Sequence, residues 1–214
     1  MKKTYFIVGT DTDCGKTYVT TRLIDALKAK SLRVLAIKPV ASGCYVENNT
    51  LVSDDVKQLN AHQEDAPNDA LFWRFLPPIS PHLAAAEKEI ELNIQSISKA
   101  VETFRTAEGD VLFVEGAGGL MVPLNMQETW VDFLIQTKIP VILVVGMRLG
   151  CINHSLLTES VLKYHGIDCA GWIANCLVPN MDALQGNIET LVSKLSSPLL
   201  ATIPFGGSIT TINM

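Results

Sequence analysis

The segment that most constrains this chain is Gly9-Thr-Asp-Thr-Asp-Cys-Gly-Lys-Thr17, which follows the apolar residues 4–8 and precedes an amphipathic segment. A glycine-rich turn between a buried strand and a helix aims consecutive backbone N–H groups, together with the positive helix end, at one point. Such a loop holds nucleotide phosphates, with Lys16 reaching the β- and γ-phosphates and the Thr17 hydroxyl binding Mg²⁺. The usual pattern has four residues between the glycines, whereas five separate Gly9 from Gly15 here. The motif predicts a P-loop at the end of the first strand.

Apolar runs rich in β-branched residues alternate along the chain with segments of helical periodicity. Runs that are apolar on both faces suit the buried strands of a parallel sheet. The helical segments carry apolar residues three and four positions apart, as Val19, Leu23 and Leu27 do. This alternation predicts an α/β fold: one P-loop NTPase-like domain over residues 1–214, with helices on both faces of a mostly parallel sheet. We expect strands at residues 4–8, 33–37, 111–114, 141–145, 169–174 and 199–203, and helices at 16–30, 94–104, 130–135, 156–164 and 184–195.

Length, charge and cysteine count exclude several classes of protein. The chain has 214 residues, and since a domain typically has roughly 150 residues, this length corresponds to one domain. A net charge of −5 disfavours non-specific nucleic-acid binding, which depends on clustered Lys and Arg. No apolar run approaches the ~18 residues of a membrane span, and the N-terminal apolar run is shorter than the ~7–15-residue core of a signal peptide. We therefore expect a cytoplasmic protein without nucleic-acid or membrane partners. The cysteines number five and none are spaced C-x-x-C, which disfavours a disulfide framework or a zinc site.

Charged side chains end two of the expected strands beside the P-loop. Glu115 follows the run 111–114 and precedes Gly116-Ala-Gly-Gly119; a strand-end carboxylate suits Mg²⁺, and glycines let the backbone approach phosphate. Lys38 ends the second strand, where a further cation would stabilise charge that develops during phosphoryl transfer. The pair Asp54-Asp55 supplies either another metal carboxylate or the first turn of a helix. The proline-rich stretch from residue 41 to about 81 is expected to be an insertion over one end of the sheet.

These segments together resemble the dethiobiotin synthetase family. The resemblance covers nearly the whole chain, and the five-residue gap in the P-loop is the family's own form. It implies an enzyme that joins 7,8-diaminopelargonate, CO₂ and ATP, with Mg²⁺, to give dethiobiotin, ADP and phosphate through a carbamate and its mixed anhydride with phosphate. Its markers are Gly9–Thr17, Lys38-Pro-Val-Ala-Ser-Gly43, Ser80-Pro-His-Leu-Ala-Ala85, Val114-Glu-Gly-Ala-Gly-Gly119, Pro140-Val-Ile-Leu-Val-Val145, Leu149-Gly-Cys-Ile-Asn-His154 and Gly171-Trp-Ile-Ala-Asn175.

The resemblance also implies roles for individual residues. Lys16 and Lys38 match the family's catalytic lysines. Thr17, Asp55 and Glu115 match its magnesium ligands; Asp55 is preferred to Asp54 because it aligns with the family without a gap from Lys38. Thr12 and Ser42 look like carbamate and substrate contacts, and Asn175 looks like a reader of the base. The other implied nucleotide contacts are Asp13, Cys14, Gly15, Tyr18, Gly116, Ala117, Gly118, Cys176, Pro204, Phe205 and Gly206.

A further implied site lies at Gly150, Cys151, Ile152 and Asn153, which look like the carboxylate-binding end of the diaminopelargonate site. This segment is also expected to open a helix. In the family it comes from the neighbouring subunit, so the resemblance implies a homodimer in which both subunits use the same surface patch at their interface. Two positions depart from the family. Asp13 stands where relatives often carry Glu, and few residues follow Pro204, where relatives commonly have a longer tail against the adenine and ribose.

Three other functions compete with this interpretation. A partitioning-type ATPase typically carries an extra lysine early in its P-loop, and none stands between Gly9 and Lys16. The synthetase domain of an amidotransferase normally accompanies a glutaminase domain, for which 214 residues leave no room. A non-catalytic nucleotide-binding regulator is disfavoured by the combination of Lys38 with Glu115.

Overall fold

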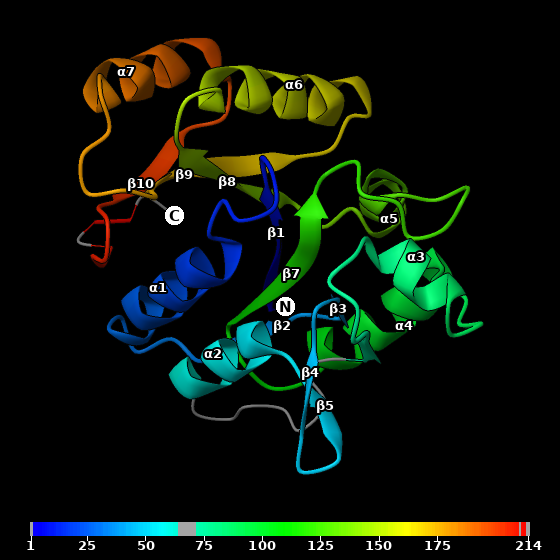
Figure 1. Cartoon of the computed structure of the whole chain (residues 1–214). Helices are drawn as coiled ribbons and strands as arrows, with labels where there is room; N and C mark the ends of the chain where they lie inside the picture. The colour runs from blue at the N-terminus through cyan, green and yellow to red at the C-terminus, as the bar shows by residue number, and fades with distance from the viewer. Residues whose placement is uncertain (1, 64–71, 210, 213–214) are drawn as a thin grey trace.

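A six-stranded parallel sheet forms the centre of the molecule (Figure 1). The computed structural model describes residues 2–63, 72–209 and 211–212. The sheet consists of β1 (Lys3–Gly9), β2 (Val34–Ile37), β7 (Val111–Gly119), β8 (Val141–Met147), β9 (Cys169–Cys176) and β10 (Leu199–Ile203).

The strand order β10-β9-β8-β1-β7-β2 places β1 between β7 and β8. The chain leaves β1 toward one edge of the sheet and later returns to build the other side, so β1 marks the point where the direction of winding reverses. In such sheets a ligand binds beyond the carboxyl ends of the strands at this point. The loop after β1 and the end of β7 therefore lie at the position that this topology favours for a site.

The helices divide between the two faces of the sheet, which confirms the predicted fold class (Figure 1). Side chains alternate along each strand, so Ile7 packs with Leu23 under the first helix while Phe6 and Val8 face the opposite layer. The helices α1 (Lys16–Lys28) and α2 (Asp54–His62) cover one face. The other face is covered by α4 (Ile94–Arg105), α5 (Trp130–Thr137), α6 (Cys151–Tyr164) and α7 (Leu184–Lys194).

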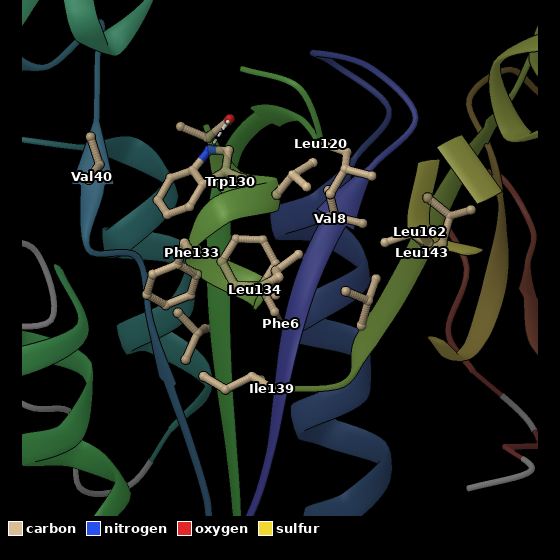
Figure 2. Close-up of a cluster of buried hydrophobic side chains, with 14 of the residues drawn as sticks. Phe6, Val8, Val40, Leu120, Trp130, Phe133, Leu134, Ile139, Leu143 and Leu162 are labelled. Atoms are coloured by element: carbon tan, nitrogen blue, oxygen red, sulfur yellow. Dashed lines mark hydrogen bonds between the residues drawn. The ribbon is translucent and has the colours of Figure 1, made fainter. Parts of the chain in front are cut away.

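An aromatic cluster holds α5 against the sheet (Figure 2). The Phe6 ring lies 5.2 Å from Trp130 and 5.6 Å from Phe133, and Trp130 meets Phe133 edge to face at 88°. Such pairs contribute about 0.5–1.5 kcal/mol each beyond the area that they bury. The Trp130 indole Nε1 also donates a hydrogen bond of 3.0 Å to the Ala117 carbonyl. The cluster therefore anchors the glycine-rich end of β7.

The predicted elements recur with changes at their ends. Strands β7 and β9 run further than their apolar runs, to Gly119 and Cys176. Helix α6 begins at Cys151, as expected for the segment that opens a helix there, and not at 156, where the apolar period starts. The period starts late because two residues on the buried face of the helix, Ser155 and Glu159, are polar. Within the described part of the chain no helix is both long and apolar enough to cross a membrane.

The insertion after residue 41 contains short elements that the sequence pattern did not show. A two-stranded ladder joins β3 (Val40–Ala41) to β6 (Trp73–Arg74), and β4 (Tyr45–Glu47) pairs with β5 (Thr50–Val52) as a hairpin. Helix α2 follows, and α3 (Pro81–Ala86) closes the segment. Residues 64–71 of the predicted insertion lie outside the described residues.

Helix α2 is anchored to the edge of the main sheet by the side chain of Gln63. Gln63 Oε1 accepts a hydrogen bond of 2.9 Å from the Ala36 N–H, and its Nε2 donates one of 3.0 Å to the Ala36 carbonyl. The Gln63 side chain thus makes the backbone hydrogen bonds to edge strand β2 that a neighbouring strand would otherwise make. This contact fixes the far end of the helix whose first turn carries Asp55.

Candidate active site

The P-loop wraps the start of α1 at the carboxyl end of β1. Gly15 adopts φ +85°, and a Cβ at this position would lie 2.1 Å from Asn175 Nδ2. The position therefore requires glycine for both its conformation and its contact. The Asn175 amide donates a hydrogen bond of 3.0 Å to the Cys14 carbonyl, and the Cys14 side chain packs in the core. The loop consequently turns its backbone, rather than the Cys14 thiol, toward solvent.

Lys16 lies along the inside of this loop. Its Nζ donates a hydrogen bond of 3.1 Å to the backbone carbonyl of Asp11, and the residue is 7% exposed. Lys16 also lines the large cavity described below. A buried ammonium beside a ring of backbone N–H groups is suited to bind negatively charged phosphate oxygens.

Two carboxylates converge on the hydroxyl of Thr17. Thr17 Oγ1 lies 2.6 Å from Glu115 Oε1 on β7 and 2.9 Å from Asp55 Oδ1 in the first turn of α2. A hydroxyl has one hydrogen and can donate to only one of these oxygens at a time. Asp54 and Asp55 follow Ser53 at the start of α2, so this pair stands in a first helical turn and also delivers a carboxylate to the site.

Lys38 joins the same cluster from the end of β2. Its Nζ donates a hydrogen bond of 2.9 Å to Glu115 Oε1 and also donates to Asp55 Oδ2. Burial lowers the pKa of Lys38, but the Glu115 and Asp55 carboxylates outweigh burial and raise that pKa above its usual range. Burial raises the pKa of Asp55, whereas the Lys38 ammonium lowers it, and the net effect is a lowered pKa. The Lys38 ammonium is therefore paired with two carboxylates in this cluster.

The donor set fits a magnesium ion. Mg²⁺ takes oxygen ligands and is usually held by one or two carboxylates together with substrate phosphates and water. The Asp55 and Glu115 carboxylates both lie within hydrogen-bond distance of the Thr17 hydroxyl. Thr17 and Asp55 line the large cavity described below, whereas Glu115 is fully buried beside them. The described residues contain no group of three or more His, Cys, Asp or Glu side chains that could hold a metal.

A cavity of about 680 Å³ opens beside these groups. It is large enough for a substrate next to nucleotide phosphates. The Ser42 hydroxyl is buried without a hydrogen-bond partner in the described structure. The predicted residues on its wall are Thr12, Asp13, Gly15, Lys16, Thr17, Lys38, Ser42, Asp55, Ala117 and Gly118.

The structure places other predicted residues elsewhere. Gly150, Cys151 and Ile152 line a second cavity of about 330 Å³ with Met181, Asp182 and Asn187, and Asn153 is exposed in the first turn of α6. Within one chain these residues do not line the larger cavity.

The predicted base-binding residues gather near the end of β10. Pro204, Phe205 and Gly206 are exposed immediately after this strand. The Tyr18 hydroxyl donates to the Gly207 carbonyl and ties this segment to α1. Cys176 is buried at the end of the adjacent β9.

Several residues at the site had no predicted role in the sequence, and most of them lie outside the recognised motifs. Thr20, one turn after the P-loop, places its hydroxyl 3.2 Å from Glu115 Oε2. Arg148, directly after β8, pairs with Asp11 at 2.5 Å. The segment Pro78–Pro81 and Val122 complete the cavity wall. Of that segment, only Ser80 and Pro81 belonged to a recognised motif, and no role was predicted for them.

A parallel sheet with a P-loop at its reversal point, beside a lysine and two carboxylates, defines the chain as a P-loop nucleotide-binding protein. A protein-family model described as an AAA domain matches residues 3–212. The ATP-dependent dethiobiotin synthetase BioD of Legionella pneumophila (strain Corby) is 50% identical over 211 residues, which cover 98% of this chain and 97% of the relative. The chain belongs to the dethiobiotin synthetase family.

More distant comparisons agree with this placement. The ATP-dependent dethiobiotin synthetase BioD of Pseudoalteromonas translucida (strain TAC 125) is 38% identical over 95% of this chain and 90% of its own length. Among solved structures, the septum site-determining protein MinD complexed with Mg-ADP from Pyrococcus horikoshii OT3 superposes with a TM-score of 0.58. That match has 21% identity and covers 95% of this chain and 82% of the other, and it supports the fold alone.

Proposed function

We propose that this chain converts 7,8-diaminopelargonate, CO₂ and ATP into dethiobiotin, ADP and phosphate. The observation that carries the proposal is Lys38, buried between Asp55 and Glu115 on the wall of the same cavity as Lys16 and Thr17. A protein that only binds nucleotide needs the P-loop, whereas group transfer also needs a cation on the far side of the transferred phosphoryl group. Membership of the dethiobiotin synthetase family supports the choice of substrates.

The proposed mechanism relies on position and charge. One substrate amine takes up CO₂ as a carbamate. A carbamate oxygen then attacks the γ-phosphoryl group of ATP, which displaces ADP and leaves the mixed anhydride of the carbamate with phosphate. The second amine then attacks the carbamoyl carbon, closes the five-membered ring and expels phosphate. Lys16 and Lys38 stabilise the charge on the transferring phosphoryl group. Thr12 and the unpartnered Ser42 hydroxyl orient the carbamate and the amine.

Thr17, Asp55 and Glu115 are the residues that would hold Mg²⁺. When bound there, the ion would neutralise phosphate charge and orient the β- and γ-phosphates. The role of the chain itself is to keep these oxygens together, through the contacts of Thr17 with both carboxylates and the contact of Thr20 with Glu115.

We further propose that the active unit is a homodimer. The predicted carboxylate-binding segment at Gly150–Asn153 lines a cavity separate from the phosphate cavity in one chain. Helix α6 and the loop that leads into it expose large apolar side chains: Leu149 is 99% exposed, Leu157 59% and Tyr164 86%. A contact between two copies through this face would cover them and would bring the segment toward the partner's cavity.

The decisive experiment measures phosphate release from ATP, Mg²⁺ and bicarbonate with and without 7,8-diaminopelargonate, followed by mass analysis of the product. The proposal predicts diaminopelargonate-dependent release with one dethiobiotin per phosphate. Phosphate release that is independent of the diamine would instead assign the chain to a switch ATPase. Nucleotide binding with no release would assign it to a regulator.

The metal assignment has its own test in Glu115→Gln. Removing one anionic ligand should raise the Mg²⁺ concentration needed for half-maximal phosphate release by about tenfold, the lower end of what disturbed metal-site partners show. Glu128→Gln, which changes a carboxylate on the opposite face of the sheet, serves as the control. An unchanged Mg²⁺ titration in Glu115→Gln would remove this residue from the proposed metal site.

A further inference from the structure

Arg148 is a cation at the carboxyl edge of the sheet to which neither the P-loop motif nor the family resemblance assigned a role. It directly follows β8, and its Nη2 lies 2.5 Å from Asp11 Oδ2 in the P-loop. We propose that Arg148 is a positioning residue, which holds the first half of the P-loop through Asp11 and thereby places Thr12 and Lys16 for reaction. The inference rests on the proposed function for its kinetic readout, but not for its structural one.

Asp11 is the point at which the loop contacts meet. Its Oδ2 pairs with Arg148, and its Oδ1 accepts a hydrogen bond of 2.7 Å from the Thr12 N–H. Its backbone carbonyl accepts the 3.1 Å hydrogen bond from Lys16 Nζ. A shift of Asp11 would therefore move a proposed substrate contact and a proposed catalytic lysine together.

The middle of the P-loop depends on this contact more than its ends do. The start is fixed by the hydrogen bond of 3.0 Å from Thr10 N–H to the Val144 carbonyl, and the end by the Asn175 amide on Cys14. Between them, Thr12 and Asp13 are exposed, and Asp13 takes the left-handed φ of +57°. In the part of the chain that the structure describes, Arg148 is the one side chain outside the loop that hydrogen-bonds to residues 11–13.

The pair is poorly placed to serve global stability. The Arg148 and Asp11 side chains are 40% and 47% exposed, and pairs this exposed contribute about 0–1 kcal/mol. Its consequence is instead local, because a displacement near 1 Å of a catalytic group can lower a rate by about 100-fold. Stability and turnover should therefore respond very differently when the pair is removed.

Arg148 also connects two regions of the proposed site. Its backbone carbonyl accepts a hydrogen bond of 3.0 Å from the Cys151 N–H at the start of α6, whose first residues line the second cavity. The residue thus links the phosphate loop of a chain to the segment proposed to bind the substrate carboxylate.

The test uses the full chain with Arg148→Met, Arg148→Lys, Asp11→Asn and the double variant Arg148→Met/Asp11→Asn. Arg105→Met is the matched control, because Arg105 forms an exposed ion pair with Glu102 at 3.1 Å on α4, away from the site. We expect Arg148→Met to lower kcat by about 10- to 100-fold with an unchanged melting temperature. Arg148→Lys should recover most of the loss, and the double variant should be no worse than Arg148→Met because both changes break one contact.

A second readout does not need turnover. Hydrogen exchange of the backbone amides at residues 10–14 should become faster in Arg148→Met and in Asp11→Asn, with no change in Arg105→Met. Unchanged exchange would overturn the positioning role, and so would a kcat within twofold of the parent chain or single losses that multiply in the double variant. If the parent chain makes no dethiobiotin, the proposed function fails, while the exchange data still decide the role of Arg148.

Discussion

Among the single residues of the site, Lys38 is the one whose charge is paired with two carboxylates. It is 6% exposed and donates to Asp55 and Glu115, so the two carboxylates share one ammonium at the cavity wall. An isolated buried ion would be expensive to desolvate, which explains why the three charges occur together. The pair Lys38–Asp55 also connects the insertion to the main sheet, since Asp55 belongs to α2.

Replacing Lys38 by Met should separate catalysis from nucleotide binding. Loss of a cation that acts on the transferred group lowers kcat by about 100- to 1,000-fold, while the P-loop contacts, and with them the dissociation constant for ATP, remain. Loss of the buried partner should also lower the free energy of unfolding by about 3 kcal/mol. Steady-state kinetics, calorimetric ATP binding and denaturant unfolding measure the three quantities.

The control for Lys38→Met is Lys57→Met, which removes an exposed lysine paired with Glu47 on the β4–β5 hairpin. It should leave both kcat and stability near their parent values. Near-normal turnover in Lys38→Met would refute the catalytic role of Lys38.

At the scale of elements, Glu159 connects α6 to the turn that enters β10. The buried carboxylate accepts hydrogen bonds from the Ser196 N–H at 2.7 Å and the Ser196 hydroxyl at 3.0 Å, and it pairs with Lys163 at 2.8 Å. Burial raises the pKa of Glu159, but the Lys163 ammonium and the serine donors outweigh burial and lower that pKa below its ordinary value of 4.5. The ionised carboxylate thus stabilises the packing of α6 and α7 at the edge of the sheet.

This geometry predicts a pH-dependent effect of Glu159→Gln. Because the folded-state pKa is below the unfolded value, the stabilisation is fully present above about pH 5 and is lost as the pH falls through the folded-state pKa. At pH 7 the variant should lose about 1.5–3 kcal/mol of unfolding free energy, the usual range for hydrogen bonds to a charged group. Denaturant unfolding between pH 7 and pH 3 should show that the unfolding free energies of the parent chain and the variant converge at low pH.

The comparison for Glu159→Gln is Glu189→Gln on α7, whose carboxylate is exposed and accepts one hydrogen bond from Gln185. The unfolding free energy of that variant should equal that of the parent chain at every pH. A Glu159→Gln deficit that stays constant down to pH 3 would contradict the assignment of the stabilisation to the ionised carboxylate.

The helices and strands could be predicted where their burial produces a regular apolar pattern in the sequence. The six strands of the main sheet are apolar on both faces and stood out, as did α1 with its apolar stripe through Leu23 and Leu27. The strands β3 to β6 are two or three residues long, too short for a period to show. The apolar period alone did not show the start of α6, because Ser155 and Glu159 face the interior, where their partners come from the helix itself and from distant turns.

At the scale of the whole molecule, the proposed site is divided between two cavities. The phosphate cavity lies over the ends of β1, β2 and β7, and the second cavity lies at the start of α6. A homodimer in which each phosphate cavity is completed by the partner's α6 would join them, and it would make the active unit larger than one folded chain.

Subunit mixing tests this division. Lys38→Met inactivates the phosphate cavity of its own chain. Asn153→Asp places a negative charge where the substrate carboxylate is proposed to bind. Each variant alone should therefore be nearly inactive. In a mixed dimer one site combines both changes and the other combines none. Random exchange makes half of the dimers mixed, so activity should recover to about a quarter of the parent value.

The mixing experiment is controlled by combining Lys38→Met with itself, which should show no recovery. Native mass spectrometry reports whether mixed dimers have formed. If they form without any recovery of activity, the substrate site lies within one chain and the proposed division is wrong.

The amino-acid order alone was sufficient for the P-loop, the parallel sheet and the charged strand ends. These depend on local properties: glycine spacing, the apolar period, and the residue at which a buried run stops. The family resemblance had already grouped Thr17, Asp55 and Glu115 as metal ligands. The hydrogen bonds that join Thr17 to both carboxylates came only from the folded chain, as did the pair Asp11–Arg148 and the hydrogen bonds between Gln63 and Ala36. Each joins residues far apart in sequence, and the strand order that places β1 between β7 and β8 brings such residues to one edge, which no local pattern records.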